Sequence, residues 1–153
     1  MRLRIYADTS VIGGCFDEEF KNASRLLIEK FKKGELLLVL SDLTEIEMRD
    51  APIHVQAVVN ALPESHIERV ELSKEAAALA EKYITQGVVA KGSLADAQHI
   101  ALATISRVDA LVSWNFKHIV NLERIRGYNS LNLRYGYPAI EIRTPWEVIG
   151  YGS

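Results

Sequence analysis

The chain has 153 residues, a length that one domain with its own hydrophobic core accounts for, and we expect a single domain over residues 1–153. Its composition, 48% hydrophobic and 25% charged, is typical of a soluble globular protein, and no apolar run approaches the ~20 residues of a membrane-spanning helix. The formal net charge of −2 argues against a general nucleic-acid coat protein, because such domains are usually strongly basic.

The first half of the chain predicts strands that alternate with helices. Residues 3–7 alternate like a strand that stops at Asp8, and Thr9-Ser10 then begins a helix. The elements expected next are a helix at 17–33 that ends at Gly34, a strand at 35–41, a helix at 42–52 interrupted by Pro52, a short helix at 52–63, a strand at 66–72 and a helix at 73–86 that starts on Ser73.

The second half continues the alternation. The stretch "SLADAQHIALATISR" (93–107) has the clearest amphipathic pattern, and Ser93 with Asp96 resembles a capping pair. A short strand is expected within 109–115, an aromatic, irregular segment at 128–137, and a last strand at 139–145 closed by Pro145. Strands alternating with helices imply a parallel sheet covered on both faces, so the predicted fold class is α/β, a three-layer α/β/α domain with a central parallel sheet.

The N-terminus and the cysteine content indicate the cellular location of the protein. Arg2 and Arg4 precede only a short strand, which is unlike a secretory signal peptide. Cys15 is the only cysteine, which excludes an intramolecular disulfide and a cysteine-based zinc site. We expect a cytoplasmic protein that does not associate with membranes.

Polar residues fall at the strand-to-helix junctions of the predicted sheet, and the carboxyl ends of parallel strands share one edge. The residues at these junctions are Asp8, Ser41 with Glu47 six residues later, Asp96, and Ser113 with Asn115. Three carboxylates in one pocket repel one another unless they are protonated or neutralised. A divalent cation such as Mg²⁺ or Mn²⁺ resolves that conflict and suits phosphodiester hydrolysis.

Two simpler interpretations stay open at these positions. Asp8 and Asp96 have the pattern of helix N-caps, and Glu47 that of a solvated helix acid. Glu45 competes with Glu47, but residues two apart on a helix point about 200° apart, so only one of them faces the pocket.

The ordered set of Asp8-Thr9-Ser10, Ser41 with Glu47, Asp96 and Ser113-Trp114-Asn115 resembles the PIN-domain family, most closely VapC-type toxin ribonucleases and their relatives. The stretches "LADAQHIALAT" and "LVSWNFKHIVN" carry much of this resemblance, which extends over essentially the whole chain.

The resemblance implies an endoribonuclease dependent on Mg²⁺ or Mn²⁺, in which Asp8, Glu47 and Asp96 are both the metal ligands and the catalytic acids. Ser10 would position a ligand or water, with Ser41 and Ser113 in support. Asn115 stands where many PIN domains have a fourth aspartate, which puts a second metal or full activity in doubt. The family further implies a homodimer, an RNA substrate and, for a toxin of a toxin–antitoxin pair, an antitoxin that blocks the site.

Other residues near these junctions are candidates for substrate contact. His99 shares a helix face with Asp96, although a buried, hydrogen-bonded histidine is the favoured interpretation. Lys117 and His118 are candidate phosphate contacts. Trp114 and Phe116 flank Asn115 and are candidates for stacking on an unpaired base, with core packing expected for at least one of them.

Two rival functions remain. One is a PIN-fold module that binds RNA or a protein without cleaving, which the amide of Asn115 and the lack of a basic stripe favour. The other is a small phosphatase or nucleotide-binding protein, since the same sheet edge suits a phosphate. The absence of a G-x-G-x-x-G or Walker-type loop disfavours the second.

Overall fold

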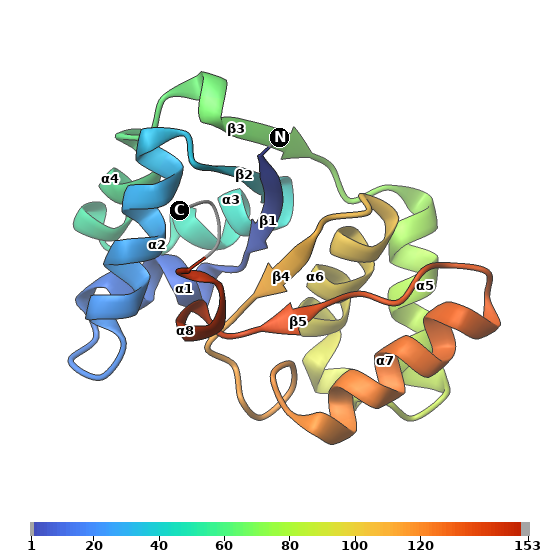
Figure 1. Ribbon diagram of the computed structural model, residues 1–153. Coiled ribbons are helices and arrows are strands. Elements are labelled where there is room, and N and C mark those ends of the chain that lie inside the picture. The colour runs from blue at the N-terminus through green and yellow to red at the C-terminus, as the bar shows by residue number, and fades with distance from the viewer. Residues whose placement is uncertain (1, 151–153) are drawn as a thin grey trace.

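The structure is a computed structural model that describes residues 2–150 (Figure 1). Within this range, five parallel strands form one sheet in the order β3-β2-β1-β4-β5. The strands are β1 (Leu3–Ala7), β2 (Leu36–Ser41), β3 (Ile67–Val70), β4 (Ala110–Val112) and β5 (Ile142–Arg143). The chain starts in the centre, adds β2 and β3 on one side of β1, and then crosses to add β4 and β5 on the other. Ile5 of β1 therefore pairs with Leu38 of β2 and with Ala110 of β4.

Helices connect the strands and cover the sheet. They are α1 (Thr9–Gly13), α2 (Lys21–Lys33), α3 (Asp42–Arg49), α4 (Ile53–Asn60), α5 (Lys74–Thr85), α6 (Leu94–Ile105), α7 (Leu122–Arg134) and α8 (Pro145–Val148), with short 3₁₀ turns η1 (Gly14–Phe16), η2 (Glu64–His66) and η3 (Lys91–Ser93). None of the helices within residues 2–150 is long and apolar enough to cross a membrane.

Alternation along the strands builds two separate cores. Ile5 and Ala7 point to the face covered by α2 and α8, where Leu27 and Phe31 of α2 are fully buried. Tyr6 points to the opposite face, which is covered by α5, α6 and α7. Figure 1 shows α2 and α8 on one side of the sheet and α5, α6 and α7 on the other. The predicted three-layer α/β/α architecture is confirmed.

Most predicted elements are present with shorter boundaries. The helix expected from residue 17 begins at Lys21, because Asp17 instead forms a turn in which its carboxylate accepts the backbone N–H groups of Glu19 and Phe20. Gly34 ends α2 with a φ of 78°, a left-handed conformation that glycine adopts easily. The last strand shrinks to two residues, and Pro145 starts α8 rather than only closing a strand.

Two expectations about α6 are wrong. Ser93 makes no capping hydrogen bond, because it belongs to η3 and has φ −105° and ψ 28°, outside the extended conformation of most N-caps. The helix is also buried around most of its circumference rather than along one stripe. Its buried residues are Ala97, His99, Ile100, Ala101, Leu102, Ala103 and Thr104.

The segment expected to be irregular at 128–137 is mostly helical. Residues Leu122–Arg134 form α7, which Asn121 caps by accepting a hydrogen bond from the backbone N–H of Arg124. Tyr128 is fully buried, and its ring lies edge-on to that of Tyr83, 4.9 Å away. Tyr128 is therefore a core residue.

Candidate functional site

The first candidate acid, Asp8, ends β1 and caps α1. Its carboxylate is 4% exposed and accepts hydrogen bonds from the hydroxyls of Ser10 and Ser113, both at 2.6 Å. The backbone N–H of Val11 also points at Oδ1, at 3.3 Å. Asp8 is therefore an N-cap, as the simpler interpretation held, and at the same time it faces the sheet edge where the other acids lie.

The second candidate acid, Glu47 of α3, is held by two other elements. Its Oε1 accepts a hydrogen bond from Thr9 Oγ1 at 2.7 Å and lies 2.7 Å from His99 Nε2. Since a carboxylate only accepts, Nε2 of His99 must carry a proton. Glu45 points elsewhere and pairs with Arg69, so the two glutamates of α3 do face different surroundings.

The histidine is the middle of a buried chain of polar side chains. His99 is 3% exposed, and its Nδ1 lies 2.6 Å from the hydroxyl of Tyr6. That hydroxyl is in turn 2.8 Å from Ser41 Oγ, which caps α3 by accepting the backbone N–H of Thr44. The favoured interpretation of His99 as a buried, hydrogen-bonded residue agrees with this geometry. Ser41 therefore supports the site through Tyr6 and His99 and touches no acid directly.

The third candidate acid, Asp96, lies in the first turn of α6. Its Oδ1 accepts a hydrogen bond from the side-chain amide of Asn115 at 3.2 Å. The amide oxygen of Asn115 accepts the backbone N–H of His118 at 2.9 Å, which fixes which way the amide points. Nδ1 of the His118 ring is buried and has no hydrogen-bond partner among residues 2–150.

Burial and mutual repulsion shape the acidity of the three carboxyl groups. Burial raises the pKa of Asp8 above its ordinary value, against the opposing charge of His99 and the serine hydrogen bonds. Burial also raises the pKa of Asp96, and the negative charges of Asp8 and Glu47 add to that effect. At Glu47 burial acts in the same direction, but the hydrogen bond and charge of His99 outweigh it, so its pKa is lowered. The three groups therefore lie within electrostatic reach of one another.

Two carboxylate oxygens of this donor set are unoccupied by hydrogen bonds from the described residues. Both hydrogen bonds to Glu47 end on Oε1 and the one to Asp96 ends on Oδ1, so within residues 2–150 Oε2 and Oδ2 accept none. Carboxylate oxygens of this kind are what Mg²⁺ and Mn²⁺ prefer. The described side chains form no group of three or more His, Cys, Asp or Glu already gathered around one point. Water would have to complete the coordination, as it commonly does for Mg²⁺.

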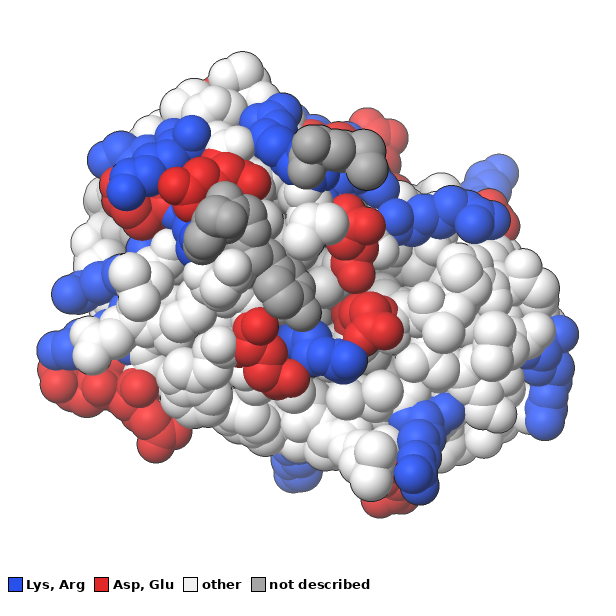
Figure 2. Space-filling model, viewed as in Figure 1, with Lys and Arg blue, Asp and Glu red and all other residues white. Residues whose placement is uncertain are grey.

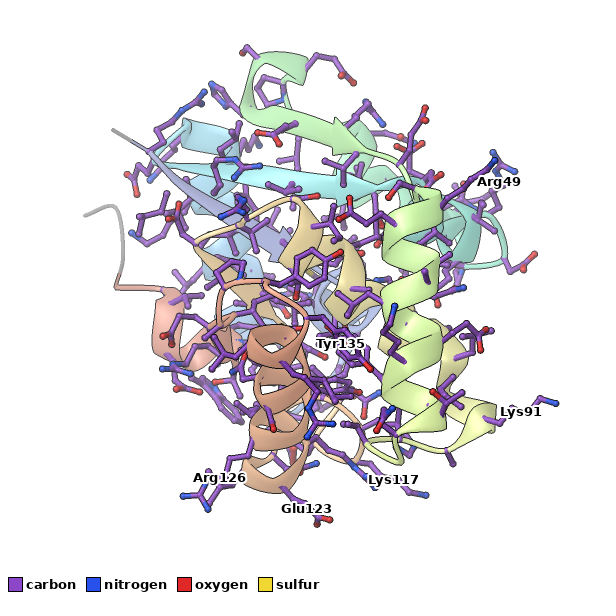
Figure 3. All side chains as sticks on the ribbon, turned by 90° about the vertical axis from the view of Figure 1, so that its right-hand side faces the viewer. Arg49, Lys91, Lys117, Glu123, Arg126 and Tyr135 are labelled. Carbon is purple, nitrogen blue, oxygen red and sulfur yellow. The ribbon has the colours of Figure 1, made fainter. Side chains whose placement is uncertain are left out.

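The basic and aromatic candidates lie at the rim of this edge. Lys117 is exposed, and Figure 3 shows it projecting from the same end of the molecule as Lys91 and Arg126, where α7 begins. On the face shown in Figure 2, basic and acidic side chains alternate and form no continuous basic stripe. Trp114 is 6% exposed and Phe116 is 43% exposed, so only the first is a core residue.

Two contributors to the site were not predicted from the sequence. Thr9 orients Glu47, and its only signal is its place inside the Asp8-Thr9-Ser10 motif. Tyr6 holds His99, yet in the sequence it is one aromatic residue within a buried strand. Both contacts bridge segments more than 35 residues apart.

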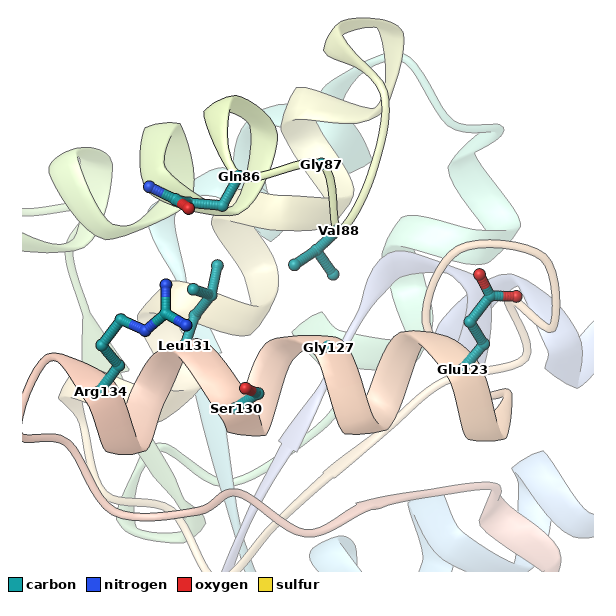
Figure 4. A pocket seen from close by; sticks show the side chains of 8 residues that line it. All are labelled: Gln86, Gly87, Val88, Glu123, Gly127, Ser130, Leu131 and Arg134. Carbon is teal, nitrogen blue, oxygen red and sulfur yellow. The ribbon is translucent and has the colours of Figure 1, made fainter.

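A surface pocket of about 370 Å³ lies away from the acids (Figure 4). It is formed by the end of α5 and one face of α7 and is lined by Gln86, Gly87, Val88, Glu123, Gly127, Ser130, Leu131 and Arg134. None of the candidate acids lines it. The candidate site is therefore defined by its chemistry at the sheet edge and not by this pocket.

The fold has known counterparts. Over 93% of this chain and 98% of the other, it matches a chain in the crystal structure of VapBC2 from Rickettsia felis bound to a DNA fragment from their promoter, with a TM-score of 0.59 and 12% identity. Over 94% of this chain and 99% of the other, it matches a chain in the crystal structure of FitAcB from Neisseria gonorrhoeae, with a TM-score of 0.56 and 14% identity. The fold is PIN-like. No model of a protein family matches the sequence, and no curated protein matches it significantly.

Proposed function

We propose that this chain is a divalent-metal-dependent endoribonuclease. The observation that carries the proposal is that the negative charges of Asp8 and Glu47, at the end of β1 and in α3, act on Asp96 in the first turn of α6. Two of these acids have raised pKa values, so they ionise less readily than free carboxyl groups, and a nearby cation would favour their ionised forms. The parallel sheet of the PIN-like fold supports the proposal, because in such sheets ligands bind beyond the carboxyl ends of the strands, and Asp8 follows the carboxyl end of β1.

In the proposed reaction Asp8, Glu47 and Asp96 hold Mg²⁺ or Mn²⁺, which when bound activates water and offsets negative charge on the phosphate. Ser10 and Ser113 keep the carboxylate of Asp8 in a fixed orientation through their hydroxyl hydrogen bonds. Thr9 and His99 do the same for Glu47 and leave its second oxygen free. Burial raises the pKa of Asp96, whereas the hydrogen bond from His99 lowers that of Glu47, so we assign to Asp96 the role of proton acceptor from a water molecule.

The test is cleavage of a mixed pool of single-stranded RNA with Mn²⁺ or Mg²⁺. We expect cutting by the wild type and a loss of at least 100-fold in Asp8→Asn, Asp96→Asn and Glu47→Gln. Glu45→Gln is the matched control, because Glu45 is on the same helix but pairs with Arg69. Equal activity in all variants would contradict the assignment of these acids.

A binding module without cleavage is the second candidate, and Asn115 favours it. The amide donates to Asp96 where a fourth carboxylate would otherwise stand, so the site has one negative charge fewer. If no RNA is cut, calorimetry with Mn²⁺ on the same variants separates the two cases. Metal binding that depends on Asp8 and Asp96 without any cleavage would identify a binding module.

We also propose a homodimer and a protein partner of the antitoxin kind. Support for an interaction surface comes from large apolar side chains that are well exposed, among them Ile53 at 83% and Leu122 at 64%. Light scattering coupled to size exclusion measures the mass in solution directly. A mass of 17.1 kDa at all concentrations would exclude the homodimer.

A further inference from the structure

Four aromatic side chains from three separate segments meet beside the acids. Phe20 precedes α2, Trp114 and Phe116 follow β4, and Trp146 lies in α8. Phe20 and Trp114 form an inner pair, stacked at 4.1 Å with 15° between their planes, and the indole N–H of Trp114 donates to Ser24 Oγ at 2.8 Å. This inner pair belongs to the core under α2.

The outer pair is different, because it is open to solvent. Phe116 is 43% exposed and Trp146 is 49% exposed. Their ring centroids are 6.4 Å apart, and their planes differ by only 25°. Trp114 lies against both at steep angles, 73° to Trp146 and 52° to Phe116, and backs the outer pair on the protein side.

This spacing matches a specific ligand geometry. Stacked bases lie about 3.4 Å apart, so a base held between two rings needs a separation of about 6.8 Å. The 6.4 Å between the two ring centroids is close to that value for rings that overlap face to face.

The segment that carries Phe116 is hydrogen-bonded to the site of the acids. The backbone N–H of Trp114 donates to Ser10 Oγ at 2.9 Å, and that hydroxyl donates to Asp8. Asn115, between Trp114 and Phe116, donates to Asp96. Phe116 therefore directly follows a residue that contacts one of the acids. Lys117, the next residue, is exposed and available to a phosphate.

We propose that Phe116 and Trp146 hold one unpaired nucleobase of a single-stranded RNA and so position the adjacent phosphate at the acids. The inference rests on the proposed function for the identity of its ligand, RNA, but not for cleavage. Base–aromatic stacking tolerates any base, so the pair would select for a single strand more than for a sequence.

The test is binding of fluorescently labelled single-stranded RNA heptamers in EDTA, measured by anisotropy. We expect the Kd to rise about 5- to 150-fold in Phe116→Ala and in Trp146→Ala, the range typical for loss of one stacked base. Phe116→Tyr and Trp146→Phe keep a ring and should stay near wild type. Leu133→Ala is the matched control, because Leu133 is 62% exposed but lies in α7.

An abasic scan makes the test specific. Removing the base at one position of the heptamer should weaken binding to the wild type and to Leu133→Ala, but add little further loss in Trp146→Ala. Unchanged affinity in both alanine variants would overturn the proposal. A second outcome would also overturn it: Phe116→Ala and Trp146→Ala change the sedimentation coefficient but not the affinity for RNA. The outer pair would then be a contact between copies of the chain.

The outcome is separable from that of the proposed function. Base-dependent binding in EDTA without cleavage in Mn²⁺ would support the aromatic pair and contradict the nuclease. Cleavage in Mn²⁺ with unchanged binding by the alanine variants would contradict the aromatic pair alone.

Discussion

Nε2 of His99 lies 2.7 Å from Oε1 of Glu47, and this contact joins α6 to α3 across the carboxyl edge of the sheet. The same helix carries Asp96 three residues earlier, so α6 supplies one acid and also orients another. Because His99 is buried, few water molecules compete with Glu47 for the N–H of its ring.

Replacing this histidine should alter both stability and acidity. His99→Phe removes the donor to Glu47 and the partner of the Tyr6 hydroxyl, and we expect the free energy of unfolding to fall by about 1–3 kcal/mol. The pKa of Glu47 should rise, because burial then acts without its main opposition. Carboxyl titration by NMR measures this directly. His54→Phe, at an exposed histidine on α4, should leave Glu47 unchanged.

Asp8 should make the protein less stable as the pH rises. Its raised pKa means that the folded state holds this proton more tightly than the unfolded chain does. The free energy of unfolding therefore falls as the pH rises from the ordinary pKa of an aspartate through the raised pKa of Asp8. Asp8→Asn keeps an acceptor for the Ser10 hydroxyl. It should be more stable than the wild type at pH values above the raised pKa of Asp8, where the wild type has a buried charge. At pH values below the ordinary pKa of an aspartate it should not be more stable than the wild type. Urea unfolding at pH 4 and pH 8 measures the free energies of unfolding of the wild type and the variant. If Asp8→Asn is less stable than the wild type at pH 8, the prediction is wrong.

Divalent cations should stabilise the wild type. At a metal concentration 100 times the Kd, binding to the folded state adds about 2.7 kcal/mol, which corresponds to about 5–10 °C in Tm for a chain of this size. Asp8→Asn and Asp96→Asn should show almost none of this shift, whereas Glu45→Gln should keep it. An equal shift in all four proteins would indicate non-specific binding.

Asn115→Asp tests the missing fourth carboxylate. Without metal, it exchanges a hydrogen-bond donor to Asp96 for a like charge, and we expect a loss of about 1–3 kcal/mol in the free energy of unfolding. Mn²⁺ should recover that loss and bind more tightly than to the wild type. Asn60→Asp, at an exposed residue, is the control. Thermal melts in EDTA and in Mn²⁺ give both quantities.

Gly127 allows α7 to approach the loop after α5. A Cβ at this position would lie 2.8 Å from Cγ1 of Val88, although alanine is otherwise favoured over glycine inside a helix by roughly 1 kcal/mol. We expect Gly127→Ala to destabilise the protein by about 1–3 kcal/mol because of overpacking. Val88→Ala in the same chain should restore most of that loss. A double-mutant cycle from chemical unfolding measures the coupling.

The strand-to-helix junctions were predictable because each depends on local pattern. β1 and β2 alternate or run apolar, and Ser41, Ser73 and Gly34 mark helix ends with short-range chemistry. The parallel order of the strands follows from their alternation with helices, so the sequence predicts a shared sheet edge for the segments that carry Asp8, Glu47 and Asp96.

The orientation of these acids could not be foreseen, because it depends on contacts between distant segments. Thr9 to Glu47 and Tyr6 to His99 span 38 and 93 residues. α7 was missed for a related reason: Asn132 is polar and suggests a loop, yet it is fully buried, where it accepts from Tyr83 and donates to Thr104. In the same way, nothing near Phe116 in the sequence indicates that Trp146 will face it.

The crossing of the chain from one side of β1 to the other has a consequence for synthesis. Asp8 and Glu47 belong to the part of the chain made first, while Asp96, Ser113 and Trp146 follow much later. At about 5–20 residues per second, the 49 residues from Glu47 to Asp96 take about 2–10 s. During that interval a nascent chain carries two of its acids but neither the third nor the aromatic pair. If the activity is as proposed, a chain interrupted at this stage lacks one of the three acids and both rings of the outer pair.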